Sequence, residues 1–155
     1  MIDFTGTPDR TGVREAAQRT FARHLELLSA GRIPEWVALF TEDGVLEFPY
    51  GPTGYPDHIT GHAALSAYMA KFPTTFQVSF TGLIFHETTD TSLVVAEFTS
   101  VGTALATGRP YNQRYISVVT TRDGLISRYV DFWNPLVAMA ALSGTAADFV
   151  KAFDG

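Results

Sequence analysis

The feature that most constrains the fold is a run of four strand-like segments in the second half of the chain. They are rich in Val, Ile, Phe, Tyr and Thr, and short segments rich in Thr, Asp and Gly separate them. Segments of this composition, joined by turns, pair as antiparallel neighbours in a sheet. The four expected strands span residues 76–86, 93–106, 111–121 and 125–134.

Helical spacing dominates the first half of the chain instead. Apolar residues recur at every third or fourth position from Val13 onward, and Gly31 is a suitable stop for this helix. The expected elements are helices over residues 13–30, 33–40 and 62–71, a short strand over 45–50, a loop over 51–61, C-terminal helical pieces over 137–142 and 146–153, and a lead-in over 1–12. This order predicts an α+β fold, in which a cone-shaped, curved antiparallel sheet wraps around the long N-terminal helix with two further helices.

Asp131 lies on the last expected strand between two large aromatic residues. Because successive strand side chains point to opposite faces, Asp131 shares its face with Tyr129 and Trp133. One interpretation is a surface carboxylate paired with Arg114 or Arg128. The other is an acid in an aromatic-walled cavity of the cone, where poor hydration raises the pKa of the carboxyl toward the range that acid–base catalysis needs.

The composition argues against several classes of protein. A chain of 155 residues suits one domain, 1–155, and a charged fraction of only 17% argues against disorder. A net charge of -5 without any basic run argues against nucleic-acid binding. The sequence has no cysteine, no apolar run that approaches the ~20 residues of a membrane span, and no signal-peptide pattern at its N-terminus. A cytoplasmic protein that binds neither nucleic acid nor a membrane is therefore expected.

Several stretches of the sequence, taken with the order of elements, resemble the nuclear transport factor 2-like superfamily. They are Val37-Ala-Leu-Phe-Thr-Glu-Asp-Gly-Val-Leu-Glu-Phe-Pro49, Thr60-Gly-His-Ala-Ala-Leu-Ser-Ala-Tyr68 and Tyr129-Val-Asp-Phe-Trp-Asn-Pro135, and the resemblance covers roughly residues 13–143. It implies a cystatin-like α+β barrel and, by analogy with the fold, a homodimer. The superfamily hosts isomerases, cyclases, hydrolases, dehydratases and non-enzymatic binders, so the fold does not identify the function.

Two branches of this superfamily can be compared residue by residue. Ketosteroid isomerases carry an aspartate, a tyrosine and a second acid at places that here look like Phe48, His24 and Ile116, so the isomerase set is mostly absent. SnoaL-like polyketide cyclases keep an aspartate on the last strand, and the PhzA/PhzB proteins have a glutamate there, followed by an aromatic pair and Asn-Pro. Counting from Gly124, that place is Asp131. The resemblance favours acid-dependent chemistry of the cyclase or condensation type.

The predicted catalytic residues are Asp131, as the proton-transfer group, and His24, as its partner across the cone or as a hydrogen-bond donor to the substrate. His24 lies on the apolar stripe of the first helix, where the alternative is a core histidine bonded to a neighbour. Arg114 is expected to bind substrate if Ile116 faces the cavity, and the alternative is an arginine on the open face of the sheet. The complete set of predicted substrate-binding residues is Trp36, Phe48, Tyr68, Arg114, Tyr129 and Trp133.

Other chemistries have no support in the sequence. The four histidines show no metal-binding spacing beyond the weak pair His58 and His62, and neither a Gly-x-Ser-x-Gly elbow nor a phosphate-binding glycine loop occurs. No metal and no organic cofactor are therefore expected. The leading hypothesis is a cofactor-independent acid–base enzyme, of cyclase, isomerase or condensation type, that acts on an apolar aromatic or polycyclic molecule. The alternative is a non-catalytic binding protein with the same pocket.

Overall fold

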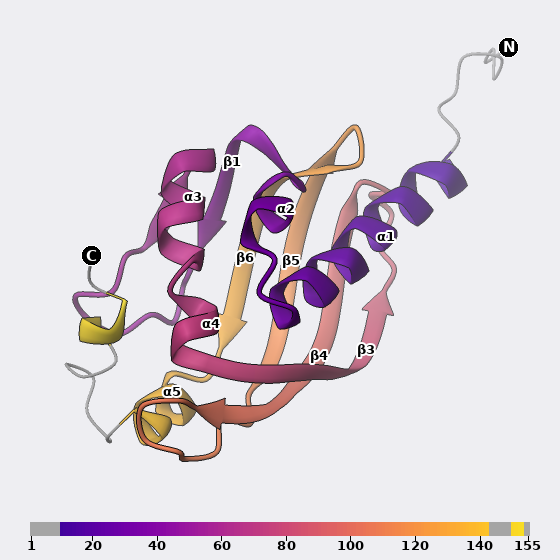
Figure 1. The fold of residues 1–155 in the computed structure, drawn as a ribbon. Coiled ribbons are helices and arrows are strands. Elements are labelled where there is room, and N and C mark those ends of the chain that lie inside the picture. The colour runs from indigo at the N-terminus through magenta and orange to yellow at the C-terminus, as the bar shows by residue number, and fades with distance from the viewer. Residues whose placement is uncertain (1–9, 143–149, 154–155) are drawn as a thin grey trace, which may run out of the picture.

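The computed structural model of the protein describes residues 10–142 and 150–153 (Figure 1). The helices are α1 (Arg10–Ser29), α2 (Ile33–Val37), α3 (His62–Met69), α4 (Phe72–Thr75) and α5 (Pro135–Ala141), and a final helical turn begins at residue 150. The strands are β1 (Phe40–Glu47), β2 (His58–Thr60), β3 (Phe76–His86), β4 (Leu93–Ala104), β5 (Arg114–Arg122) and β6 (Leu125–Trp133). None of the described helices is both long and apolar enough to cross a membrane.

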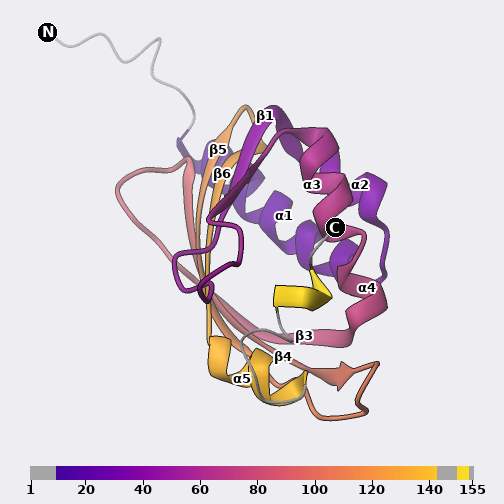
Figure 2. The ribbon, with the colours of Figure 1, turned by 90° about the vertical axis from the view of Figure 1, so that its left-hand side faces the viewer.

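The strands form one sheet in the order β2-β1-β6-β5-β4-β3. All neighbouring pairs are antiparallel except β1 and β6, which run parallel. The sheet curves around α1, so that α1, α2 and α3 lie on its concave side (Figure 2). The predicted α+β fold, with a curved sheet around the N-terminal helix, is confirmed, although the parallel contact of β1 makes the sheet mixed.

Helix α1 presents a continuous apolar stripe to the sheet. Phe21, Leu25 and Leu28 follow the spacing of one helix face, and all three side chains are buried. Burying side chains of this size stabilises the fold by about 1.5–3 kcal/mol each, so packing on the sheet fixes the position of the helix. A hydrogen bond of 2.6 Å from Thr20 Oγ1 to the carbonyl of Gly124 adds an anchor at the turn between β5 and β6.

Several element boundaries differ from the prediction. Strand β1 includes residues 41–44, which separate the expected helix over 33–40 from the expected strand over 45–50, and residues 58–60 of the expected loop pair with it as β2. The ladder pairs of β1 with β6 and β2 are Phe40 and residues 45–47, and the register shifts between Phe40 and Val45, so residues 41–44 form an irregular segment within the strand. Residues 1–9 of the expected lead-in and residues 146–149 of the expected C-terminal helix lie outside the described residues.

Strand β6 follows the predicted alternation only over its second half. Tyr129 and Trp133 are buried on the concave side, and Asp131 lies between them in the same wall. Strict alternation from Tyr129 would put Ile126 on the opposite face, but Ile126 is fully buried, because the pairing with β5 shifts by one residue between Ile126 and Arg128. A bulge of this kind moves the preceding side chains to the other face. The alternation therefore holds where Asp131 lies and fails nearer to the turn.

Candidate functional site

A cavity lies between α1, α3 and the concave side of the sheet. Its volume is about 60 Å³, which is room for roughly four or five water molecules. Among the described residues, the titratable side chains in its wall other than phenols are His24 and Asp131. The aromatic part of the wall consists of Trp36, Tyr55, Tyr68, Phe72, Phe76, Phe80, Phe98, Tyr111, Tyr115, Tyr129, Trp133 and Phe153.

The carboxyl group of Asp131 is the acid of this wall. Its oxygen Oδ1 is buried and has no hydrogen-bond partner among the described residues. Burial raises the pKa of Asp131 from an ordinary value of 3.8 to about 7, because the charged form loses its hydration. An acid with this pKa can take up or release a proton near neutral pH, as a general acid–base catalyst must.

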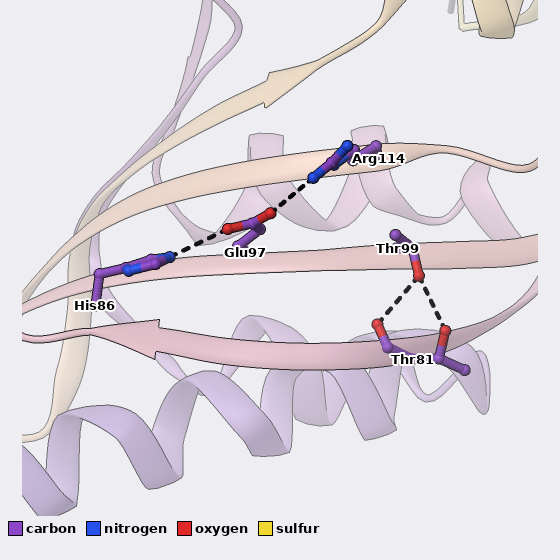
Figure 3. Close-up of polar contacts among 5 residues, drawn as sticks. All are labelled: Thr81, His86, Glu97, Thr99 and Arg114. Atoms are coloured by element: carbon purple, nitrogen blue, oxygen red, sulfur yellow. Dashed lines mark hydrogen bonds and ion pairs between the residues drawn. The ribbon is translucent and has the colours of Figure 1, made fainter.

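The two arginines that were considered as partners of Asp131 are paired elsewhere. On the outer face of the sheet, Nη2 of Arg114 donates a hydrogen bond of 3.0 Å to Glu97 (Figure 3). Arg128 makes two hydrogen bonds, of 2.8 and 2.9 Å, with the carboxylate of Glu47. Because no arginine neutralises Asp131, its pKa is set by burial alone. The interpretation of Asp131 as a surface carboxylate paired with one of these arginines does not hold.

His24 belongs to a buried chain of hydrogen bonds. The indole Nε1–H of Trp36 donates to Nδ1 of His24 across 3.2 Å, and Nε2 of His24 lies 2.9 Å from the hydroxyl of Tyr129. Burial lowers the pKa of His24 to about 3, so the ring is neutral and carries one N–H group. Since an indole can only donate, Nδ1 is the acceptor, and the proton of His24 is on Nε2.

The chain of hydrogen bonds continues from His24 to the level of Asp131. The hydroxyl of Tyr129 lies 2.7 Å from Oγ of Ser117, and Ser117 pairs with Asp131 across β5 and β6. Because Tyr129 accepts a hydrogen bond from His24, its own proton is available to Ser117 or to a bound molecule. No hydrogen bond among the described residues joins Ser117 to Asp131, so the chain ends at Ser117 and the structure does not link His24 to Asp131 as the expected proton-transfer partner.

Four further tyrosine hydroxyls surround the cavity. Those of Tyr55 and Tyr68 share a hydrogen bond, and that of Tyr115 lies 3.2 Å from Oγ of Ser100. Burial raises the pKa of Tyr111 to about 12 and raises the pKa of the other three phenols as well. All four phenols are neutral near pH 7, and neutral hydroxyls can donate hydrogen bonds to an oxygen of a ligand.

Together these groups suit proton transfer at a carbon atom. A phenol or the neutral form of Asp131 can hold a carbonyl oxygen, and the ionised form of Asp131 can remove a proton from the adjacent carbon. Nothing in the wall resembles a metal site, since residues 10–142 and 150–153 contain no cluster of three His, Asp or Glu side chains that could hold a metal ion.

The structure brings most of the predicted site residues to one cavity. Both predicted catalytic residues, Asp131 and His24, lie in the wall. Phe48 is buried but does not line the cavity. Its ring packs against that of the wall residue Tyr68, with 5.2 Å between the centroids. The predicted substrate-binding residues that line the cavity are Trp36, Tyr68, Tyr129 and Trp133.

Arg114 corrects the expectation that it faces the cavity. Its side chain is 78% exposed and pairs with Glu97 on the opposite face of the sheet. Strand β5 turns Tyr115 and Ser117 toward the helices, so Arg114 and Ile116 point outward. The place that the resemblance assigned to the second acid of ketosteroid isomerases is thus an outward-facing residue.

Many wall residues were not among those predicted from the sequence, and three of them show why. Tyr115 lies on the inward face of β5, and Tyr111 lies in the loop before this strand. Strand side chains alternate between the two faces, so placing Ser117 on the inward face would have placed Tyr111 and Tyr115 there too. Phe153 comes from the C-terminal turn. No periodicity within the sheet points to a residue at that place in the chain.

Comparison with known proteins identifies relatives of the whole fold. A family model described as a SnoaL-like domain matches residues 21–129. An uncharacterized PhzA/B-like protein of Pseudomonas aeruginosa, PA3332, is 43% identical over 131 residues, which are 84% of this chain and 93% of that protein. The crystal structure of a candidate isomerase from Bacillus subtilis is 40% identical with a TM-score of 0.82, and the match covers 84% of this chain and 95% of that one.

A more distant solved structure shares the fold. It is a phenazine biosynthesis-related protein of Pseudomonas aeruginosa, with a TM-score of 0.75 and 23% identity. The match covers 89% of this chain and 92% of that one. At this level of identity the likeness concerns the arrangement of helices and strands rather than the chemistry.

Proposed function

The chain belongs to the SnoaL-like domain family, and from that premise we propose that it binds a small apolar molecule, aromatic or polycyclic, and acts on it by cofactor-independent acid–base chemistry. The reaction would be of the cyclase, isomerase or condensation type, with Asp131 as the proton-transfer group. The observation that carries the proposal is the buried Oδ1 of Asp131, which lies in an aromatic wall without a hydrogen-bond partner among the described residues.

The geometry of the wall suggests a role for each polar group. With its pKa near 7, Asp131 is present in both protonation states at neutral pH, so it can remove a proton from one position of a substrate and return it to another. Tyr129 has a proton available for a substrate oxygen, because His24 already donates to its hydroxyl. His24 and Trp36 are positioning residues that fix the direction of this hydrogen bond.

Exchange of carbon-bound protons tests the proposal without knowledge of the natural substrate. The probe is 2-tetralone, a bicyclic aryl ketone, in D₂O, and the readout is the loss of its α-proton signals in NMR spectra. We expect the protein to accelerate exchange above the buffer rate, and Asp131→Asn to reduce the acceleration by about 10²-fold or more. Asp43→Asn is the matched control, because Asp43 is an exposed carboxylate outside the cavity.

The binding of 2-tetralone separates catalysis from recognition. If Asp131→Asn binds the ketone as tightly as the wild type but exchanges no protons, the catalytic role of Asp131 is supported. If the wild type binds the ketone and exchanges no faster than buffer, the acid–base proposal is overturned for this class of ketone.

A binding protein without catalysis is the second proposed function. Its support is the absence of the ketosteroid isomerase aspartate on the first strand, whose place the resemblance assigns to the buried Phe48. Under this function the cavity and its phenols would recognise a ligand, and Asp131→Asn would change affinity rather than turnover.

We also propose that the protein is a cytoplasmic homodimer that pairs through the outer face of its sheet. Val101 and Ile116 are apolar residues exposed on that face, at 58% and 37%. A second subunit that packs on this face would remove both side chains from water. Sedimentation equilibrium tests the assembly: the wild type is expected at twice the monomer mass, and Val101→Asp is expected to shift it toward the monomer.

A further inference from the structure

The cavity is too small for the class of ligand that its walls suit. Its volume of about 60 Å³ is several times below the 300–1,000 Å³ of typical ligand sites. An aromatic or polycyclic molecule can therefore enter only if a part of the wall moves. Most of the wall belongs to α1, α3 and the central strands, which are held by the packed core and the backbone bonds of the sheet.

Phe153 enters the wall from the C-terminal turn, outside this framework of helices and strands. It lies on the short turn over residues 150–153, which is beside α4 in both views of the ribbon (Figures 1 and 2). Lys71 Nζ donates a hydrogen bond of 3.0 Å to the carbonyl of Phe153. Val150 of the same turn approaches Gly54 in the loop before β2.

The ring of Phe153 is held by other aromatic rings. It stacks on Tyr68 at 5.4 Å between centroids and 27° between planes, and lies 6.3 Å from Phe76 with a tilt of 32°. Tyr55 closes a third side in an edge-on contact at 6.0 Å. Offset and edge-on contacts of this kind are the preferred geometries of aromatic pairs. Three rings thus form a slot that accommodates a phenyl group.

We infer that the slot between Tyr68, Phe76 and Tyr55 is an aryl-binding subsite, and that Phe153 occupies it in place of the aryl group of the ligand. This inference rests on the proposed function, because it takes the ligand to be an apolar molecule bound in the cone. Asp131 lies in the wall of the same cavity. A ligand whose ring displaces Phe153 would therefore extend its remaining part toward Asp131.

The apparent affinity for an aryl ligand should then depend on how often Phe153 leaves the slot. When only a fraction of the molecules is competent to bind, the apparent dissociation constant rises by the inverse of that fraction. Removing the ring of Phe153 makes every molecule competent. Removing the ammonium group of Lys71 loosens the turn but leaves the ring in place.

The test measures binding of 4-fluorotoluene and of fluorocyclohexane by ¹⁹F NMR line broadening. We expect Phe153→Ala to bind 4-fluorotoluene roughly tenfold more tightly than the wild type, as follows if the slot is open in about a tenth of wild-type molecules. We expect Lys71→Met to give a smaller gain, and fluorocyclohexane to gain less than the aryl probe in both variants. Phe85→Ala is the matched control, because Phe85 is a partly buried phenylalanine of β3 outside the cavity wall.

The outcomes separate this inference from the proposed function. If the wild type, Phe153→Ala and Lys71→Met bind 4-fluorotoluene with equal affinity, the proposed role of Phe153 is overturned, and the proposed apolar site is unaffected. Equal gains for the two probes would show an unselective apolar space rather than an aryl subsite. If no folded variant, judged by circular dichroism, binds either probe, the proposed apolar ligand is itself wrong.

Discussion

The indole Nε1–H of Trp36 donates a hydrogen bond to Nδ1 of His24, and this contact determines which ring nitrogen of His24 carries the N–H proton. A neutral histidine has one N–H group, and an indole can only donate. The proton is consequently on Nε2, directed at the hydroxyl of Tyr129. Trp36 of α2 thus fixes the direction of a hydrogen-bond chain that runs through His24 and Tyr129 to Ser117. Ser117 is the residue that pairs with Asp131 across β5 and β6.

The first prediction concerns the state of His24. In ¹⁵N NMR spectra of the wild type, His24 should show an unprotonated Nδ1 and a protonated Nε2. It should not titrate between pH 5 and 8, because burial lowers its pKa to about 3. In Trp36→Phe the donor to Nδ1 is gone, so a mixture of both tautomers is expected. His24→Phe assigns the resonance, and a protonated Nδ1 in the wild type would contradict the proposed direction of the chain.

The second prediction concerns the pH dependence of stability at Asp131. Its pKa is raised to about 7 in the folded protein, so below pH 4 both states carry the proton and the free energy of unfolding is unaffected. As the pH rises from 4 to 7, the unfolded state ionises first, and the folded state loses stability relative to it. Above pH 7 the loss is complete, at up to about 4 kcal/mol.

Asp131→Asn removes this loss because the amide stays neutral. We expect the variant to be more stable than the wild type by about 2–4 kcal/mol at pH 8, with a difference that shrinks toward pH 4. Urea unfolding of both proteins at several pH values measures it. Taking the difference cancels the contributions of the other acids, and a difference that grows toward low pH would show that the carboxyl of Asp131 is hydrated.

The architecture could be predicted from the sequence because it depends on periodicity. The stripe of α1 and the alternation of Tyr129, Asp131 and Trp133 are local patterns, and both appear in the structure as expected. The predicted family is confirmed as well. The parallel pairing of β1 with β6 was not predicted, since no local pattern records which distant strand will supply the hydrogen bonds.

The parts of the site that were missed depend on register. A shift of one residue exchanges the two faces of a strand. The resemblance to ketosteroid isomerases placed an acid of the cavity at Ile116, and the alternation then placed Arg114 in the cavity as well. In the structure Tyr115 and Ser117 face the cavity instead. The bulge in β6 and the contact of Phe153 are tertiary features, so neither has a signal in the local sequence.

The third prediction follows from the outward position of Arg114. Its ion pair with Glu97 is largely exposed, and such pairs contribute only about 0–1 kcal/mol. We expect Arg114→Ala to lower the free energy of unfolding by less than about 1 kcal/mol and to leave the affinity for 4-fluorotoluene unchanged. Calorimetry and ¹⁹F NMR measure the two effects, and a large loss of affinity would restore Arg114 to the binding site.

The fourth prediction concerns Tyr129, whose hydroxyl lies between His24 and Ser117. Tyr129→Phe keeps the ring but leaves the buried Nε2–H of His24 without its acceptor, which should cost about 1–3 kcal/mol in the free energy of unfolding. Tyr50→Phe is the matched control, because Tyr50 is 60% exposed and its loss of a hydroxyl should be nearly neutral. In the exchange assay with 2-tetralone, Tyr129→Phe should slow α-proton exchange even when the pH lies above 7, since the lost group is a neutral donor rather than the titrating acid. If Tyr129→Phe is destabilised as expected but exchanges protons at the wild-type rate, the hydroxyl of Tyr129 supports the core and does not hold the substrate oxygen.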